Sequence, residues 1–375
     1  MYKSQSLDSK SRARTGTINL HHGPINTPCF MPVGTNGSVK GMKHGTLEDM
    51  GVEIILANTY HLYLRPGIEV IKRLGGLHKF SNWKKNILTD SGGYQVFSLA
   101  PFRKILEEGV KFRSHIDGSY HLLTPESVVD LQTAFGSDIL MPLDVCTGPD
   151  LTEKKALGAL IQTTKWLERT KNHWTIQVDK GSKGQLFGIV QGNFFNNLRL
   201  QSLEDTLRIN TPGIAIGGLS VGEPFEVYQA MLDNLAPNLP SEKPRYVMGI
   251  GTPDFILSAV EAGIDIFDCV YPTRVARNGS VLTKRGLVDL KKSIHEMSTD
   301  PIEIGCQCTA CTYYSKAYIR HMFKTNEMLG PMLATEHNIQ FMHNFLKEIR
   351  NSIDNDMFIE YKNKFITDFY NEYRE

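Results

Sequence analysis

The stretch GIDIFDCVYPTRVARNG, residues 263–279, is the most informative part of this chain. It begins as a short apolar run bounded by glycine and proline, which is typical of a buried strand. A lone carboxylate, Asp268, stands where that run ends, and Arg274 and Arg277 follow in what we expect to be a loop. A carboxylate beside two arginines suits attack on an electrophile that is carried by a polyanion. The alternative is a strand-end aspartate that caps a turn.

Seven similar apolar runs precede this one, and each closes on small or polar residues. Helical patterns lie between the runs, and they open at Thr46, Thr124, Thr152 and Pro253. Eight strands that alternate with helices over about 250 residues predict an α/β fold, the (β/α)₈ TIM barrel. The predicted strands lie within residues 28–34, 53–60, 86–93, 138–144, 185–192, 213–218, 245–251 and 265–270.

Three additions to the barrel are expected. Residues 14–20 and 22–27 alternate around a turn and predict an N-terminal hairpin. Residues 104–122 follow the third strand, and Asp117-Gly118 within them is typical of a hairpin turn. The third addition is an inserted C-terminal zinc-binding subdomain. We therefore divide the chain into a catalytic barrel with its hairpin (1–285), the zinc-binding subdomain (286–346) and a C-terminal helix packing on the barrel (347–375).

The overall composition is almost neutral. The 375 residues include 41 Lys and Arg against 40 Asp and Glu, so the net charge gives no general attraction to nucleic acid. No run reaches the length of about 18 apolar residues that would span a membrane. The polar N-terminus lacks the apolar core of a signal peptide. We expect a cytoplasmic protein with no membrane contact.

One local patch is strongly basic. Between Arg274 and Lys292 there are six basic residues and one acidic residue. A charge run is more often a solvated face than a binding site. This run begins beside Asp268, which favours phosphate binding.

The six cysteines indicate a metal site rather than disulfides. Cys306, Cys308 and Cys311 are closely spaced, and His337 follows before a helical stretch, with His321 and His343 as alternatives for the fourth ligand. Three thiolates and one imidazole fill a tetrahedral Zn²⁺ and leave no open position. We therefore expect one structural zinc ion per chain.

Polar residues gather at the ends of the predicted strands. In a TIM barrel these ends meet at one face, where active sites lie. The alternative is that each carboxylate caps the next helix. The strand ends carry Asn58, Asp90, Asp144, Gln191, Gly217-Gly218, Met248-Gly249 and Asp268.

Together these motifs resemble the bacterial tRNA-guanine transglycosylases, the queuine tRNA-ribosyltransferase family. The resemblance runs from about Thr15 to Leu346. It implies exchange of guanine for preQ1, a 7-deazaguanine, at the anticodon wobble position of tRNAs with a G-U-N anticodon (those for Tyr, His, Asn and Asp), without a redox cofactor. It also implies a homodimer that uses the zinc segment, where Tyr313, Tyr314, Tyr318 and Phe323 are clustered. The motifs are DSGGYQVFS (90–98), GIVQG (188–192), GGLSVGE (217–223), YVMGIG (246–251), FDCVYPTR (267–274) and the cysteine cluster.

The resemblance also assigns roles to residues. It implies that Asp268 is the nucleophile, that Asp90 is the general acid and base, and that Asn58 orients the nucleophile. The expected base-edge contacts are Asp144, Gln191, Gly218 and Leu219, with Ser91 and Cys146 in the same pocket and Tyr94 and Met248 on the two sides of a stacking slot. The expected RNA contacts are Arg274, Arg277, Lys284 and Arg285, and the expected zinc ligands are Cys306, Cys308, Cys311 and His337.

Two positions depart from the family pattern, and both border the base pocket. Val145 stands where we expect Glu, and Asn193 stands where we expect Gly. Cys146 and Val221 are residues that we associate with preQ1 users, whereas loss of the acid at Val145 should weaken discrimination against preQ0. The alternatives are a transglycosylase that scavenges queuine and a non-catalytic tRNA-binding partner subunit.

Overall fold

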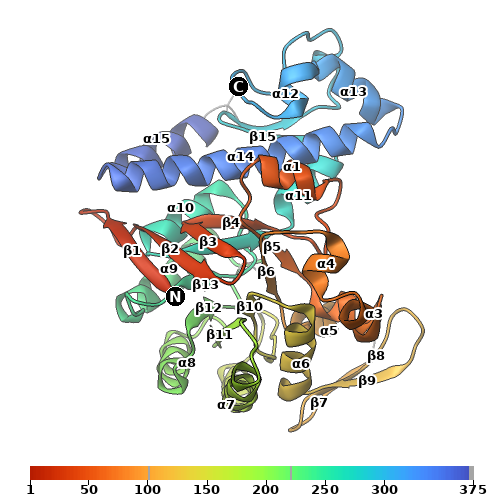
Figure 1. Cartoon of the computed structure of the whole chain (residues 1–375). Helices are drawn as coiled ribbons and strands as arrows, with labels where there is room; N and C mark the ends of the chain where they lie inside the picture. Colours follow the sequence, from red (N-terminus) through yellow and green to blue (C-terminus); the bar gives the residue numbers. More distant parts are fainter. Residues whose placement is uncertain (100–101, 220–221, 371–375) are drawn as a thin grey trace.

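The computed structural model describes residues 1–99, 102–219 and 222–370. Eight parallel strands form one sheet in the order β4–β14–β13–β12–β11–β10–β6–β5. Figure 1 shows most of these strands at the centre of the molecule. Each of the eight predicted runs contains one of these strands, so the predicted barrel is confirmed. The strands are β4 (Cys29–Pro32), β5 (Ile54–Ala57), β6 (Asn86–Thr89), β10 (Ile139–Leu140), β11 (Gln185–Val190), β12 (Gly213–Ile216), β13 (Arg245–Val247) and β14 (Ile266–Cys269).

The sheet closes on itself between its two outermost strands. Val33, just after β4, forms a parallel bridge with Leu56 of β5, and the Gly34 amide donates to the Leu56 carbonyl at 2.6 Å. Inward-facing side chains such as Met31, Phe187 and Ile266 fill the barrel. Because both faces of the strands are buried, they read as continuous apolar runs rather than as alternating ones.

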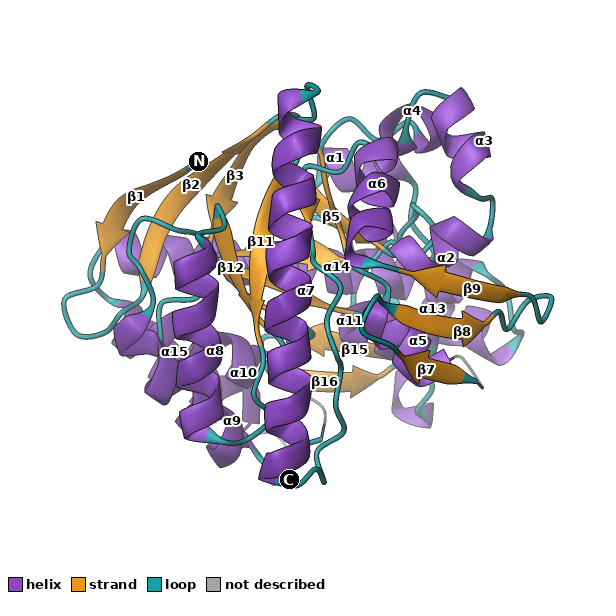
Figure 2. Ribbon diagram, turned by 90° about the horizontal axis from the view of Figure 1, so that it is seen from below, coloured by secondary structure: helices purple, strands orange, loops and turns teal. Residues whose placement is uncertain are grey.

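Helices surround the barrel and connect its strands (Figure 2). The helix predicted at Thr124 begins there: its side chain accepts from the Ser127 amide, and Pro125 occupies the first turn. The helix predicted at Thr46 instead starts at His44. The helices are α1 (His44–Asp49), α2 (Thr59–Leu64), α3 (Ile68–Arg73), α4 (Leu77–Ser81), α5 (Gly93–Leu99), α6 (Pro125–Phe135), α7 (Glu153–Asp179), α8 (Asn196–Ile209), α9 (Phe225–Leu235) and α10 (Pro253–Glu261), with a 3₁₀ turn at Ala236–Asn238.

The loop expected after Asp268 is in fact a helix, α11 (Tyr271–Arg277). Pro272 lies in its first turn, where a missing amide proton costs nothing. The Arg274 amide donates to the Val270 carbonyl at 2.8 Å, so the expectation that both arginines lie on a loop was wrong.

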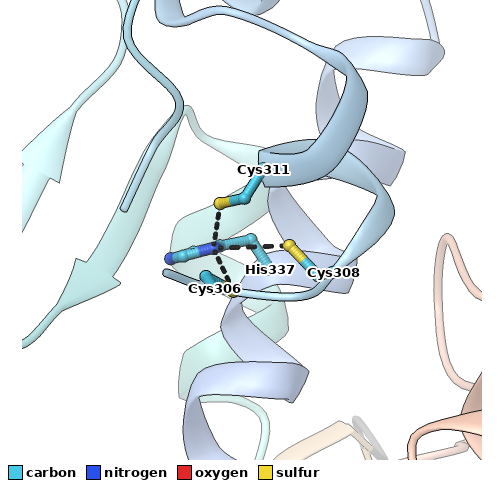
Figure 3. Close-up of side chains that lie close together, drawn as sticks. All are labelled: Cys306, Cys308, Cys311 and His337. Carbon is cyan, nitrogen blue, oxygen red and sulfur yellow. Dashed lines mark hydrogen bonds between the residues drawn. The ribbon is translucent and has the colours of Figure 1, made fainter. Parts of the chain in front are cut away.

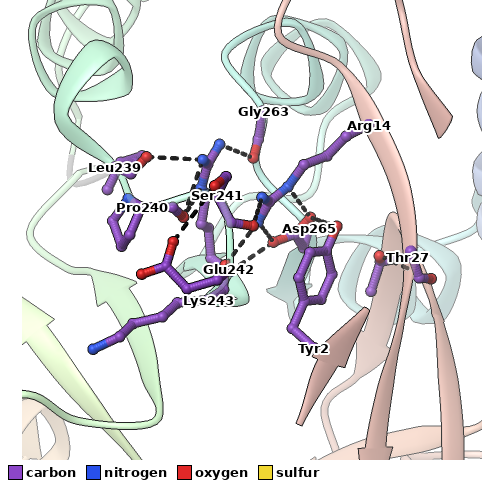
Figure 4. Close-up of polar contacts among 12 residues, drawn as sticks. Tyr2, Arg14, Thr27, Leu239, Pro240, Ser241, Glu242, Lys243, Gly263 and Asp265 are labelled. Atoms are coloured by element: carbon purple, nitrogen blue, oxygen red, sulfur yellow. Dashed lines mark hydrogen bonds and ion pairs between the residues drawn. The ribbon is translucent and has the colours of Figure 1, made fainter. Parts of the chain in front are cut away.

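The predicted N-terminal hairpin, β2 (Arg14–Leu20) and β3 (Gly23–Thr27), is present and gains an unpredicted third strand, β1 (Tyr2–Leu7). Figure 4 shows how it is fastened to the end of the barrel where β14 begins. The buried Arg14 guanidinium donates to both oxygens of Asp265, at 3.0 and 2.6 Å. The same carboxylate accepts from the Arg245 amide at 2.7 Å. The ion pair between Arg14 and Asp265 therefore joins the hairpin to β13 and β14.

The insertion after β6 is a three-stranded antiparallel sheet, which we call the ribbon. It consists of β7 (Arg103–Ile105), β8 (Val110–Arg113) and β9 (Tyr120–Leu123). Asp117 and Gly118 lie in the connection between β8 and β9, as predicted, and β7 was not predicted. Figure 2 shows the ribbon standing out from the side of the barrel.

The C-terminal part lies across the barrel (Figure 1). A single long helix, α14, runs through position 346/347, and position 285/286 lies at the end of the turn between β15 and β16. The first proposed limit therefore coincides with the start of β16, the second falls inside α14, and the division itself stays a prediction. The elements are β15 (Ser280–Thr283), β16 (Gly286–Asp289), a 3₁₀ turn (Ser293–His295), α12 (Thr309–Tyr313), α13 (Lys316–Lys324), α14 (Leu329–Asp354) and α15 (Phe358–Tyr370).

Hydrogen bonds and an ion pair join the N-terminal segment to the C-terminal helices. Ser9 donates from its amide and hydroxyl to the carboxylate of Asp356, and the Thr15 hydroxyl donates to Asp354 at 2.7 Å. Lys10 pairs with Glu360 on α15. Among the described residues no helix is long and apolar enough to cross a membrane.

Candidate active site and metal cluster

Asp268 is held by one of its two carboxylate oxygens. Its Oδ1 accepts from the Tyr246 hydroxyl at 2.5 Å and from the Gly249 amide at 2.8 Å. No donor among the described residues contacts Oδ2. Burial raises the pKa of Asp268, and the bonds from Tyr246 and Gly249 oppose that rise. The carboxylate is thus fixed in direction while one oxygen is left free.

Tyr246 was not among the predicted site residues. It lies on β13 and is fully buried, so its hydroxyl needs a partner inside the protein. In the sequence it looks like an ordinary strand aromatic. The only signal was its place two residues before Met248, on a strand whose end was already expected to face the site.

Asp90 follows β6 on the same rim. Its Oδ1 accepts from the Thr59 amide at 2.9 Å, and its Oδ2 accepts from the Asn58 side chain. Burial raises the pKa of Asp90 to about 7; backbone donors at Thr59 and Gly92 and the Asn58 amide oppose the rise, while the charge of Asp268 adds to it. Asn58 was expected to orient Asp268. It contacts Asp90 instead, because it follows β5, which pairs with β6 rather than with β14.

Asp144 and Gln191 form a second polar group, at the ends of β10 and β11. Asp144 is 8% exposed and accepts from the Gln191 side chain at 2.7 Å. The Cys146 thiol lies 3.6 Å from the same oxygen, and the Ser91 hydroxyl lies 3.5 Å from the other. Burial raises the pKa of Asp144, and Gln191 opposes the rise. The structure therefore brings these four predicted residues together.

A buried arginine that sequence reasoning missed supports this group. Arg199 of α8 is fully buried and donates to the carbonyls of Asn193, Gly217 and Gly218 at 2.7, 2.6 and 3.0 Å. Burial lowers the pKa of Arg199 to about 10, so it stays charged at neutral pH. Carbonyls can hold a buried cation whose cost in free energy would otherwise be high.

The backbone conformation at Gly218 favours glycine. Its φ is +66°, and a Cβ there would lie 2.6 Å from the Gln191 side-chain oxygen. Leu219, next in the chain, is 3% exposed. Val221, the second expected residue of the size gate, lies outside the described residues.

The expected stacking residues lie on the same rim. Tyr94 is on α5, is 55% exposed, and its ring lies 6.5 Å from that of Phe97. Met248 follows β13 and is half-buried.

The four expected RNA contacts differ in their surroundings. Arg274 of α11 is exposed, and Arg277 of the same helix is half-buried. The Nη1 of Arg277 is buried without a hydrogen-bond partner among the described residues. Lys284 pairs with Glu348 at 2.7 Å, and Arg285 is exposed in the turn between β15 and β16.

The three clustered cysteines surround one nitrogen of His337 (Figure 3). The sulfur atoms of Cys306, Cys308 and Cys311 lie 3.7, 3.7 and 3.3 Å from its Nδ1. In a tetrahedral zinc site, bond lengths of about 2.3 Å to sulfur and about 2.05 Å to nitrogen place these atoms about 3.6 Å apart. The spacing therefore fits an ion at the centre of the cluster.

The second ring nitrogen of His337 favours this histidine as the fourth ligand of such an ion. Its Nε2 lies 2.8 Å from the Leu282 carbonyl, so it carries the proton and leaves Nδ1 free to bind a metal. His321 is exposed on α13, and His343 packs near Gly51. Cys306, Cys308, Cys311 and His337 are thus able to hold a metal ion.

A second cluster, His22, His78 and Asp138, also brings possible ligands close together. The two imidazole rings are stacked, 3.7 Å between centroids and 17° from parallel. One ion cannot lie near the plane of both rings in that arrangement. Asp138 precedes β10, at the end of the barrel opposite the candidate site, so we assign the cluster a structural role.

Comparison with known proteins identifies the family. The sequence model described as queuine tRNA-ribosyltransferase matches residues 8–371. The chain belongs to this family. It is 53% identical over 364 residues to the queuine tRNA-ribosyltransferase of Treponema denticola, covering 97% of this chain and 96% of that protein. It is 52% identical over 364 residues to that of Borrelia hermsii (96% of each chain) and 49% identical over 361 residues to that of Desulforapulum autotrophicum (96% of each).

The structure shows the contacts of Asn193 and Val145, the two residues that depart from the pattern expected for this tRNA-guanine transglycosylase family. Asn193 has a φ of +55°, a region that asparagine tolerates better than most residues. Its side chain donates to the Gly148 carbonyl at 2.8 Å and to the Thr147 hydroxyl at 3.2 Å. It therefore ties the segment after Gln191 to the loop that carries Cys146. Val145 is buried in an apolar cluster that includes Trp166.

Removal of the metal tests the cluster. Elemental analysis should find about one zinc ion per chain. Cys308→Ser should lose the ion and lower the melting temperature by about 10 °C or more, because a closed site contributes folding free energy. His321→Ala is the matched control and should retain both ion and stability. A chelated protein that melts like the metal-bound form would contradict a structural role.

Proposed function

We propose that this chain exchanges guanine at the wobble position of tRNAs with a G-U-N anticodon for preQ1, through a covalent ribosyl–Asp268 intermediate. One observation carries the proposal. Asp268 is fixed through Oδ1 with Oδ2 free, and Asp90 follows β6 on the same rim, where the charge of Asp268 helps to raise its pKa. A nucleophile and a proton donor with separated roles are what a two-step displacement at a sugar carbon needs.

In the first step, Oδ2 of Asp268 attacks C1′ of the ribose as the bond from C1′ to the base breaks. The electron pair of that bond stays with guanine, which takes a proton from Asp90. A pKa of about 7 lets Asp90 hold that proton near neutral pH. The Tyr246 hydroxyl and the Gly249 amide keep the attacking carboxylate pointed at the sugar.

In the second step, the incoming base attacks C1′ and the ester bond to Asp268 breaks. The base gives its ring N–H proton to Asp90, which returns to its starting state. Two displacements on opposite faces retain the configuration at C1′. Zinc takes no part in either step; held by the three cysteines and His337, it would supply a structural cross-link.

The base is held by the second polar group. Asp144 can accept hydrogen bonds from N–H groups of a purine edge, and Gln191 can donate to its carbonyl oxygen. Gly218 and Leu219 offer backbone groups on the same side. Ser91 and Cys146 border Asp144, and Tyr94 and Met248 supply flat and soft surfaces for stacking. Reading a flipped-out base needs such a set of edge and face contacts.

The RNA backbone is held by cations beside the mouth of the barrel. Arg274 is exposed and Arg277 carries a buried guanidinium nitrogen without a partner among the described residues. A phosphate oxygen would satisfy that nitrogen once the Arg277 side chain turned outward. Lys284 and Arg285 extend the basic surface, although Lys284 would first have to release Glu348.

We propose a homodimer through the zinc segment. The segment exposes large apolar side chains, which monomeric proteins rarely gather on one surface. Of the aromatic residues expected there, Tyr313 is 76% and Tyr318 is 40% exposed, while Tyr314 stacks on Tyr318 and Phe323 is half-buried. Ile294, Met297, Ile304 and Met328 add exposed apolar area.

Guanine exchange tests the proposed function. Radiolabelled guanine should enter a tRNA transcript with a G-U-N anticodon, and wild type should form a tRNA adduct that survives a denaturing gel. Asp268→Asn should lose the adduct and at least about 10⁴-fold in turnover. Asp233→Asn, an exposed position on α9, is the control. Wild type that binds tRNA without exchange would instead favour the non-catalytic partner subunit.

The pH profile tests the role of Asp90. Because Asp90 must carry a proton, activity should fall as the pH rises through about 7. The Asn58 side chain favours the ionised form, so Asn58→Ala should raise the pKa of Asp90 and move this limb to higher pH. Asn351→Ala, exposed on α14, should leave the limb in place. A limb that moves to lower pH in Asn58→Ala would contradict this assignment.

Competition between bases tests the size of the pocket. The Cys146 thiol lies beside the base-reading carboxylate, so it limits the room for a 7-substituent. Wild type should use preQ1 in preference to queuine, with weak discrimination against preQ0, and Cys146→Ala should raise the relative kcat/KM for queuine. Wild type that prefers queuine to preQ1 would make this protein a scavenging enzyme.

A further inference from the structure

The outer face of the ribbon combines cations and exposed rings. Strand pairing places Lys104 opposite Lys111, Lys111 opposite Leu122, and Arg113 opposite Tyr120. Phe102 joins this face, since the Arg113 guanidinium lies 6.0 Å from the centre of its ring. Phe102 and Tyr120 are 61% and 67% exposed.

The acidic side chains of the ribbon, Glu107, Glu108 and Asp117, lie in its two connections rather than on its strands. The strands Arg103–Ile105, Val110–Arg113 and Tyr120–Leu123 contain no Asp or Glu. Among the described residues, none of the cations on them forms an ion pair. Like charges directly opposite on neighbouring strands are destabilising, and here Lys104 faces Lys111. Charge on an edge strand can guard against aggregation. Lys111 and Arg113 lie on the central strand β8, so protection of an edge does not explain their charges.

The ribbon is anchored to the candidate active site on its inner face. Phe112 is buried, and its ring lies 5.4 Å from that of Tyr60, two residues after Asn58. The Tyr60 hydroxyl also bonds His115, in the loop between β8 and β9, at 2.7 Å. The outer face is therefore held in a fixed relation to the residues around Asp90.

The edge of the ribbon continues the rim of the site. The Arg103 guanidinium lies 4.3 Å from the centre of the Phe97 ring and donates to the Phe97 carbonyl. Phe97 is next to Tyr94 on α5. Aromatic and cationic side chains thus run from the mouth of the barrel out onto the ribbon. In Figure 1 the ribbon and the zinc-bearing helices lie on opposite sides of the barrel.

We propose that the outer face of the ribbon is a second RNA-binding surface, which holds the tRNA substrate away from the nucleotide that enters the barrel. The occupant is identified by chemistry: lysines and an arginine suit phosphates, and exposed rings beside cations suit unstacked bases. A folded RNA is wider than a barrel mouth, so it must extend over the rim. This proposal rests on the proposed function, because it takes tRNA to be the substrate.

A matched pair of double variants tests the proposal. Lys104→Ala/Lys111→Ala removes two cations from the outer face, and Lys84→Ala/Lys85→Ala removes two exposed lysines just before β6. Binding and exchange are measured with a full-length tRNA transcript bearing a G-U-N anticodon, at several salt concentrations. Circular dichroism and light scattering check the fold and the oligomeric state of each variant.

The ribbon variant should raise Kd and KM for the tRNA about tenfold. It should also reduce the slope of log Kd against log salt by about 1.5, as expected for two lost phosphate contacts. The control pair should match wild type in both quantities. Tyr120→Ala should weaken binding with little change in the salt slope, because it removes stacking rather than charge.

Other outcomes separate this inference from the proposed function. If wild type exchanges guanine while both double variants bind tRNA alike, the ribbon does not bind RNA and the proposed function stands. If light scattering shows that only the ribbon variant changes its oligomeric state, the face contacts a second copy of the chain and the inference is wrong. If wild type exchanges no guanine, the proposed function itself fails.

Discussion

Closure of the parallel sheet is the constraint on which the rest of this structure depends. In the strand order, β14 is second and β6 is seventh, so in an open sheet Asp268 and Asp90 would stand five strand spacings apart, about 24 Å. The bridge between Val33 and Leu56 joins β4 to β5 and leaves three spacings on the short way round. The curvature of a barrel then brings the two strand ends toward a common mouth. Only in that arrangement can the charge of one carboxylate act on the other.

Burial of Asp90 at this mouth of the barrel makes the native state less stable at neutral pH. An Asp whose pKa is about 7 in the folded protein and about 3.9 in the unfolded chain binds its proton more tightly when folded. The stability contributed by that proton is present below about pH 4 and is lost as the pH rises toward 7. Asn58 and the backbone donors at Thr59 limit the loss without removing it. An acid that can donate near neutral pH therefore costs folding free energy.

Local patterns in the sequence predicted much of the fold and part of the site. The eight apolar runs, the cap at Thr124 and the cysteine spacing each depend on a few neighbouring residues. The predictions failed where distant residues decide the outcome. The helix α11 begins at a Tyr-Pro pair that equally suits a turn, and β1 is mostly polar because only a few of its side chains are covered. Tyr246 and Arg199 acquire their roles from partners on other elements, which no spacing along the chain reveals.

The hydrogen bonds between the N-terminal and C-terminal segments have a consequence for how this protein folds during synthesis. Ser9 and Thr15 find their partners at Asp356 and Asp354, more than 330 residues later. Likewise β4, the first barrel strand, pairs with β14, the last. During synthesis from the N-terminus, β4 must therefore wait for this partner until residues 266–269 have left the ribosome, and Ser9 and Thr15 must wait for residues near the end of the chain. Such distant contacts slow folding and leave strand edges open to wrong partners in the meantime.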